Sequence, residues 1–125
     1  MSKANLRRRG TVGEAIAAVF LQQRGVELLE HSFRSGRSGE IDLIGRDGTA
    51  LVFFEVKLRS DAGSGAPQEA VTQTKQKTIC RTADYYRFLH GIAWETPVRF
   101  DVVAIEMEAE CAHVRWIKGA FPYHH

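Results

Sequence analysis

The chain has 125 residues, of which 44% are hydrophobic and 26% are charged. This composition is typical of one globular domain and excludes a disordered or fibrous chain. A domain of this length buries enough surface to fold without disulfides or a structural metal, so we expect any metal to serve function. No stretch approaches the roughly 20 apolar residues of a membrane span, and we predict a cytoplasmic protein without a membrane partner.

The net charge of +2 is unevenly distributed. Residues 1–81 carry an excess of Lys and Arg, whereas residues 82–125 carry a small excess of Asp and Glu. A basic front half is compatible with phosphate backbones as partners, although solvated basic faces are common on proteins of other kinds. Cys80 and Cys111 lack paired spacing, the five His residues lack ligand spacing, and neither set is a site candidate.

The first expected element is a helix over residues 12–24, ended by Gly25. Thr11 followed by Glu14 has the form of a capping box at its start. The middle of this segment is entirely apolar, so we expect it to be covered on most sides, with Glu14 at the edge of a dry region. Residues 1–10 are predicted to be a basic flexible tail and residues 11–125 a single domain.

Three strands are predicted next, over residues 26–33, 40–44 and 50–59. The last two are joined by an Asp-Gly turn, which is typical of an antiparallel hairpin. The run 51–54 is apolar at every position, which indicates a central strand covered on both faces.

A long helix over residues 68–90 and strands over 98–105 and 111–117 complete the pattern. Val71, Ile79, Ala83 and Tyr86 form an inward stripe on the helix, and Lys75 falls on that stripe. The order predicts an α/β sandwich. Because a helix connects the third strand to the fourth, we expect those two to be parallel neighbours in a mixed sheet.

The residues that could take part in a reaction lie on the predicted hairpin. The strand period of two places Glu55 and Lys57 on one face of their strand. Asp42 lies between Ile41 and Leu43 and is expected to project from the face opposite both. If the register agrees, Asp42 meets Glu55.

Two carboxylates so placed would repel each other and raise a pKa unless a cation lay between them. Mg²⁺ suits such a site because it takes hard oxygen ligands from carboxylates, waters and substrate phosphates. Such an ion can polarise a phosphodiester and generate the nucleophile, with Lys57 positioning the water or the phosphate. The pattern therefore favours a metal-dependent nuclease that acts on a nucleic acid docked by basic side chains.

Four motifs together resemble the YraN-like family, across nearly the whole chain. They are Gly13-Glu14, Gly39-Glu40-Ile41-Asp42-Leu43-Ile44, Phe54-Glu55-Val56-Lys57 and Arg99-Phe100-Asp101-Val102-Val103. That family is grouped with the PD-(D/E)XK nuclease superfamily and is similar to archaeal Holliday-junction resolvases. The resemblance implies a restriction-endonuclease-like αβββαβ core with a Mg²⁺ site.

By this resemblance, Glu14 matches the acid of the first helix, Asp42 the motif aspartate, and Glu55 with Lys57 the E-x-K pair. Ile41 replaces the superfamily's Pro before the aspartate. The implied activity is Mg²⁺-dependent endonucleolytic hydrolysis of DNA, branched DNA included, with Asp42 and Glu55 as metal ligands and Mn²⁺ as a substitute.

Several alternatives stay open at this point. Glu14 could instead cap its helix, Glu40 and Lys75 could support the site or be solvated, and the chain could bind nucleic acid without cleaving it. Arg34, Arg37 and Arg59 are the candidates for nucleic-acid docking. Arg99 and Asp101 share a strand face and are predicted to form a structural pair. An exposed sheet edge would also allow a homodimer.

Overall fold

The computed structural model describes residues 3–36, 39–59 and 71–124. The elements are α1 (Lys3–Gln23), β1 (Glu27–Ser35), β2 (Gly39–Asp47), β3 (Ala50–Arg59), α2 (Gln73–Leu89), β4 (Val98–Met107) and β5 (Ala112–Ile117). The predicted order of helices and strands is therefore confirmed. Within the described ranges, neither helix is long and apolar enough to cross a membrane.

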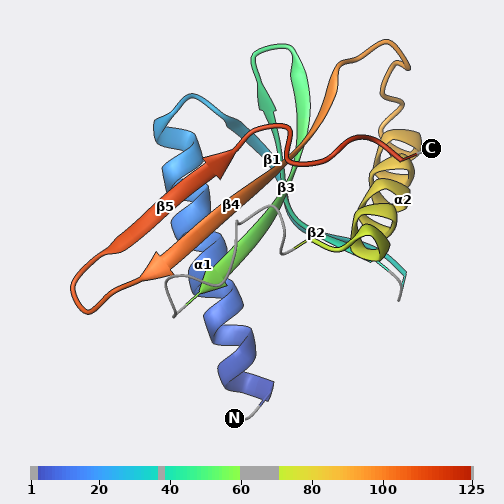
Figure 1. Ribbon diagram of the computed structural model, residues 1–125. Helices are drawn as coiled ribbons and strands as arrows, with labels where there is room; N and C mark the ends of the chain where they lie inside the picture. The colour runs from blue at the N-terminus through green and yellow to red at the C-terminus, as the bar shows by residue number, and fades with distance from the viewer. Residues whose placement is uncertain (1–2, 37–38, 60–70, 125) are drawn as a thin grey trace.

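The strands form one five-stranded sheet in the order β1-β2-β3-β4-β5. β3 and β4 are parallel, as predicted from the helix between them, and the other neighbours are antiparallel. Helix α1 packs on one face of the sheet and α2 on the other (Figure 1). This α/β architecture is consistent with a restriction-endonuclease-like core.

The sheet separates two hydrophobic cores, and β3 contributes to both. Leu51 and Phe53 pack in the core on the α2 side, whereas Val52 and Phe54 pack in the core on the α1 side. All four side chains are at most 1% exposed. This confirms that the uninterrupted apolar run 51–54 is a central strand covered on both faces.

Helix α1 begins earlier than predicted. It starts at Lys3, so Thr11 lies inside the helix and cannot act as its N-cap. Residues 3–9 are mostly good helix formers without proline, which explains helical backbone where a flexible tail was expected. The capping-box interpretation of Glu14 is therefore wrong, and the Glu14 side chain is available for another role.

Helix α2 begins at Gln73, after the N-cap Thr72, whose hydroxyl accepts a hydrogen bond from Lys75 N at 3.2 Å. The predicted start at 68–70 lies outside the described residues. The predicted inward stripe of Val71, Ile79, Ala83 and Tyr86 is buried in the core on the α2 side. This confirms which face of α2 meets the sheet.

A glycine allows α2 to approach the start of β2. A Cβ added at Gly39 would lie 2.0 Å from Oγ1 of Thr82 and 3.4 Å from Cγ2 of Thr78, both on α2. No side chain fits at that distance, so only glycine permits this helix position. The close packing also places the first turn of α2, with Lys75, beside the acidic residues of the hairpin.

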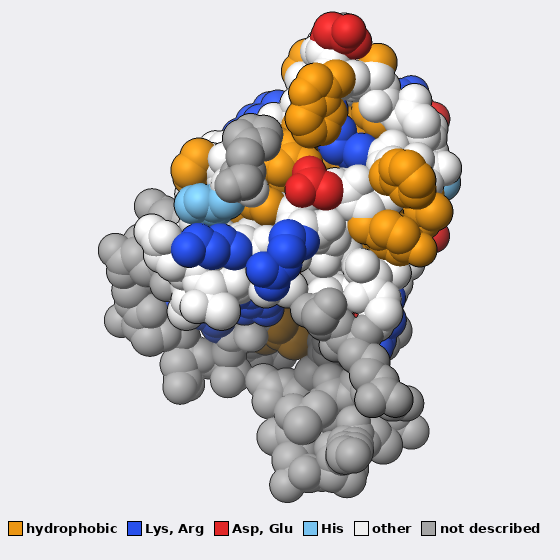
Figure 2. Space-filling view, turned by 90° about the vertical axis from the view of Figure 1, so that its right-hand side faces the viewer, with side chains coloured by type: hydrophobic (Ala, Val, Ile, Leu, Met, Phe, Trp, Pro, Cys, Tyr) orange, Lys and Arg blue, Asp and Glu red, His pale blue; other side chains and the backbone are white. Residues whose placement is uncertain are grey.

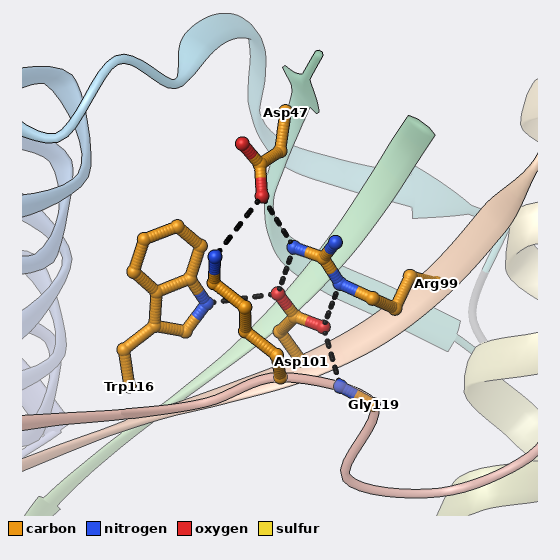
Figure 3. A network of polar contacts seen from close by, with 6 residues as sticks. Asp47, Arg99, Asp101, Trp116 and Gly119 are labelled. Carbon is orange, nitrogen blue, oxygen red and sulfur yellow. Dashed lines mark hydrogen bonds and ion pairs between the residues drawn. The ribbon is translucent and has the colours of Figure 1, made fainter. Parts of the chain in front are cut away.

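Asp101 is the centre of a polar network that ties β4 to the end of β2, to β5 and to the residues just after β5 (Figure 3). Its carboxylate is fully buried and accepts hydrogen bonds from Arg99 Nε and Nη2 at 2.9 Å, Trp116 Nε1 at 2.8 Å and Gly119 N at 2.9 Å. Arg99 also contacts Asp47 Oδ2 at 2.8 Å, on the hairpin turn. The predicted Arg99–Asp101 pair is confirmed.

Hydrophobic side chains are also exposed on the α2 side of the molecule (Figure 2). Phe88 and Trp94 are 81% and 71% exposed, near the end of α2 and in the loop after it. Tyr86, in contrast, is buried against Phe53 and Phe33.

Asp101→Asn should destabilise the fold strongly. The side-chain amide that replaces the carboxylate would turn N–H groups toward groups that are themselves donors. It would also leave the Arg99 guanidinium without its buried counter-charge. Together these changes should lower the free energy of unfolding by about 3–5 kcal/mol. Urea denaturation followed by circular dichroism measures the change. Asp47→Asn is the matched control, because Asp47 is 24% exposed and its loss should cost much less. Equal losses in the two variants would contradict the central role of Asp101.

Candidate metal and nucleic-acid site

The candidate site lies where β2 and β3 separate. Their antiparallel pairing ends at Leu43 and Phe54, whereas β3 continues to pair with β4 as far as Arg59. Beyond the end of the ladder, the backbone N–H of Val56 donates to Oδ2 of Asp42 at 2.8 Å. The Asp42 carboxylate therefore takes the place of a backbone carbonyl and stays between the two strands.

The expected alternation of side chains along β2 is wrong at this point. Ile41 packs in the core on the α2 side, whereas Leu43 packs in the core on the α1 side, so the two lie on opposite faces. A regular strand would place residues two apart on the same face. The strand is therefore irregular around Asp42, and this irregularity turns the carboxylate toward β3.

The neighbouring strand β1 is irregular at the same level. Its pairing with β2 includes His31 with Leu43 and Phe33 with Ile41, but it omits Ser32 and Asp42 between them. Ser32 has φ of 51°, the only positive φ of a non-glycine residue in the described ranges. This conformation is unfavourable for serine and persists only where the surroundings impose it.

The Ser32 side chain binds the first acid of the site. Its Oγ donates to Oε2 of Glu14 at 3.2 Å, linking β1 to α1. Carboxylate oxygens, one each from Glu14, Glu40 and Asp42, lie within 4.8 Å of one another. Glu40, expected at most to support the site, is thus a member of its carboxylate cluster.

Glu55 lies beside this cluster but contacts cations. The side chain is 6% exposed, and its Oε1 lies 2.6 Å from Lys75 Nζ and 3.4 Å from Lys57 Nζ. The expected proximity of Glu55 and Lys57 is confirmed. Lys75 leans over the sheet toward Glu55, which settles the alternative in which its charge points away into solvent.

The electrostatics of the acids reflect crowding and burial. Burial, followed by the negative charge of Glu55, raises the pKa of Asp42 from its ordinary value of 3.8 to about 7, against the opposing hydrogen bond from Val56. Burial also raises the pKa of Glu14, and the hydrogen bond from Ser32 offsets this only in part. Burial is therefore the main reason that these two acids are costly to ionise, and the charges of neighbouring acids add to it.

The pKa values of the two lysines are shifted in opposite directions. Burial lowers the pKa of Lys57, with a further lowering by the charge of Lys75 and a partial compensation by Glu55. Burial would also lower the pKa of Lys75, but its hydrogen bond and charge interaction with Glu55 outweigh burial and raise it. Lys75 is therefore the firmer counter-charge of Glu55, and Lys57 is the cation held less firmly.

The structure describes two of the three basic residues that were expected to dock nucleic acid. Arg34 follows Ser32 on β1, is 70% exposed and lies 3.6 Å from Glu40. Arg59 ends β3, two residues beyond Lys57. Arg37 lies outside the described residues. Arg34 and Arg59 thus come from the strands that carry the site.

Ser32 was not among the predicted site residues. A serine between His31 and Phe33 has no distinguishing sequence pattern, and its relevance comes from its hydrogen bond to Glu14 at the irregular stretch of β1. Glu40 carried a weak signal, since it shares strand parity with Asp42, but parity alone does not bring two carboxylates together.

The raised pKa of Asp42 predicts a loss of stability with increasing pH in metal-free buffer. An acid whose pKa is raised on folding binds its proton more tightly in the folded state. The unfolded state therefore binds fewer protons between about pH 4 and about pH 7, and the free energy of unfolding falls as pH rises through this window. Urea titrations at about pH 5 and about pH 8 should show that the free energy of unfolding decreases more for wild type than for Asp42→Asn. Equal decreases would show that Asp42 does not titrate abnormally.

Comparisons with known proteins place the chain in a family. Residues 13–105 match the model of "Uncharacterised protein family UPF0102". A UPF0102 protein of Acetivibrio thermocellus is 43% identical over 96% of this chain and 95% of its own length. UPF0102 proteins of Marinobacter nauticus and Pseudomonas syringae are 37% and 39% identical, over 96% and 97% of this chain and 97% and 98% of their own lengths. The chain therefore belongs to the UPF0102 family, the YraN-like family that its motifs resemble.

Proposed function

We propose that this protein is a divalent-metal-dependent nuclease that hydrolyses phosphodiester bonds in DNA. The observation that supports the proposal most is the convergence of Glu14, Glu40 and Asp42 within 4.8 Å, where β2 and β3 separate. Glu55, Lys57 and Lys75 border the same cluster. This combination of crowded acids and adjoining lysines has the charges required to bind a metal and a phosphate together.

The residues fit a hard divalent cation. All donors in the cluster are carboxylate oxygens, the ligand type that Mg²⁺ and Mn²⁺ prefer. Burial and the nearby acids raise the pKa of Asp42 and Glu14, and a bound cation would oppose both effects. A cation held by Asp42, with Glu14 and Glu40 beside it and Glu55 as a further ligand, would be placed to do so. When bound, the metal would polarise the phosphodiester and activate water for attack.

The protein's own groups divide the remaining tasks. The bond between Asp42 and Val56 N fixes one acid relative to β3, and the bond from Ser32 fixes Glu14 relative to β1. Lys57 and Lys75 would compete with a metal for Glu55, because both contact its Oε1. Lys57, the lysine with the lowered pKa, would contact a phosphate oxygen or the attacking water where Glu55 holds a metal.

Substitutions at the centre of the site should abolish metal-dependent cleavage. Asp42→Asn and Glu55→Gln remove proposed ligands and should reduce cleavage to background, and Lys57→Ala should reduce its rate by about 100- to 1,000-fold, as for loss of one transition-state donor. Branched and linear DNA would be incubated with each variant and Mg²⁺ or Mn²⁺, and calorimetry would measure binding of the metal.

Two matched control variants test whether the loss of any nearby charge would have the same effect on cleavage. Glu27→Gln removes an exposed acid at the far end of β1, and Lys77→Ala removes an exposed lysine near Lys75 on α2. Both should cleave like wild type. Unchanged cleavage in Asp42→Asn or Glu55→Gln would exclude those residues from the mechanism. Metal-independent DNA binding without cleavage of any substrate would favour the alternative of a non-catalytic binding module.

Substitution of Ser32 should change the affinity for metal and the free energy of unfolding in ways that can be measured separately. Ser32→Ala removes the hydrogen bond to Glu14 and keeps the unfavourable φ, whereas Ser32→Gly removes both. Both should weaken Mn²⁺ binding about 10- to 100-fold, the usual cost of losing a ligand's hydrogen-bonded partner. Ser32→Gly should be more stable than Ser32→Ala by about 1 kcal/mol because it relieves backbone strain. Wild-type Mn²⁺ affinity in both variants would show that Ser32 has no positioning role.

A further inference from the structure

A second group of metal-binding side chains lies at the tip of the β4–β5 hairpin. Glu108 N donates to Cys111 O at 2.9 Å and closes the turn. Met107 pairs with Ala112 directly before this turn, so Glu108 and Cys111 are the next residues opposite each other. His113 lies two residues beyond Cys111 and thus on the same face of the hairpin. The turn therefore brings the side chains of Glu108, Cys111 and His113 to one side.

The donor atoms of these side chains form a compact triangle. Cys111 Sγ lies 3.9 Å from Glu108 Oε2 and 3.9 Å from His113 Nε2, and the last two atoms are 3.3 Å apart. Usual zinc bond lengths in a tetrahedral site imply edges of about 3.4 Å for N···O and about 3.6 Å for S···N and S···O. A shift of a few tenths of an ångström in one exposed side chain would bring the triangle to these values.

An ion pair alone does not account for this arrangement. His113 and Glu108 are 61% and 58% exposed, and a pair at such exposure contributes little to stability. Cys111 Sγ also lies within hydrogen-bond distance of both partners, so three donor atoms of different types gather at the hairpin tip. One ligand bound by all three groups would account for the whole triangle.

We propose that Glu108, Cys111 and His113 form a zinc-binding site, with water completing a tetrahedral arrangement. A thiolate, an imidazole and a carboxylate are the donor types that zinc takes in proteins, and the sulfur disfavours Mg²⁺ and Ca²⁺. The site differs in chemistry from the Glu14–Glu40–Asp42 cluster, which offers oxygen alone. It stands whether or not the protein is a nuclease, and it would give Cys111 a role that its lack of paired spacing does not indicate.

Cobalt substitution tests this proposal directly, because Co²⁺ bound to a thiolate gives a sulfur-to-metal charge-transfer band and Co²⁺ bound to oxygens does not. Titration of the reduced full chain with Co²⁺ should give this band together with tetrahedral d–d bands, and Zn²⁺ should displace both. Cys111→Ser should lose the charge-transfer band although Cys80 remains. Because Glu108 and His113 are direct ligands, Glu108→Gln and His113→Gln should weaken Zn²⁺ binding by more than about 10-fold.

Glu110→Gln is the matched control, since it changes an exposed acid in the same turn that is not part of the triangle. It should bind Zn²⁺ and Co²⁺ like wild type. Circular dichroism would establish that each variant is folded. The proposal is overturned if wild type shows no thiolate band, if the band survives in Cys111→Ser, or if Glu110→Gln weakens binding as much as Glu108→Gln.

Discussion

The bond between the Asp42 carboxylate and the Val56 backbone N–H is the interaction on which the proposed site depends. It forms where β2 stops pairing with β3, so it gives a backbone donor a partner that the ladder no longer provides. The same bond keeps a carboxylate in a half-buried position beside Glu55, where burial and negative charge raise its pKa to about 7. The fold thereby retains an acid that is costly to ionise without a cation.

Two carboxylates of this sheet have opposite electrostatic environments. Asp101 is surrounded by donors from Arg99, Trp116 and Gly119, and its charge is balanced within the fold. Asp42 has one backbone donor and other acids as neighbours. A balanced buried charge contributes to structure, whereas an unbalanced one favours binding of an external cation. This contrast is the physical reason for treating Asp101 as a structural residue and for proposing Asp42 as a metal ligand.

The two proposed metal sites would separate two kinds of metal chemistry. The Glu14–Glu40–Asp42 cluster offers only oxygen donors and suits Mg²⁺ or Mn²⁺, whereas the hairpin tip offers sulfur and nitrogen as well as oxygen. One donor set is built from α1 and the kinked strand β2, and the other from a single turn. Zinc at the tip would therefore constrain the hairpin without occupying the place proposed for the phosphate.

The sequence by itself determined the order of elements, the parallel pairing of β3 with β4 and the central place of β3. These features follow from local periodicity, turn residues and connection rules, which are all properties of neighbouring residues. It also indicated Asp42, Glu55 and Lys57 through an acid within an apolar strand and an E-x-K pair. Only the tertiary structure decided that Glu14 binds Ser32 rather than capping its helix, that Lys75 contacts Glu55 and that Glu40 joins the acids. These contacts join different elements across an irregular stretch of β2, and a regular strand period cannot describe a place where the strand itself is irregular.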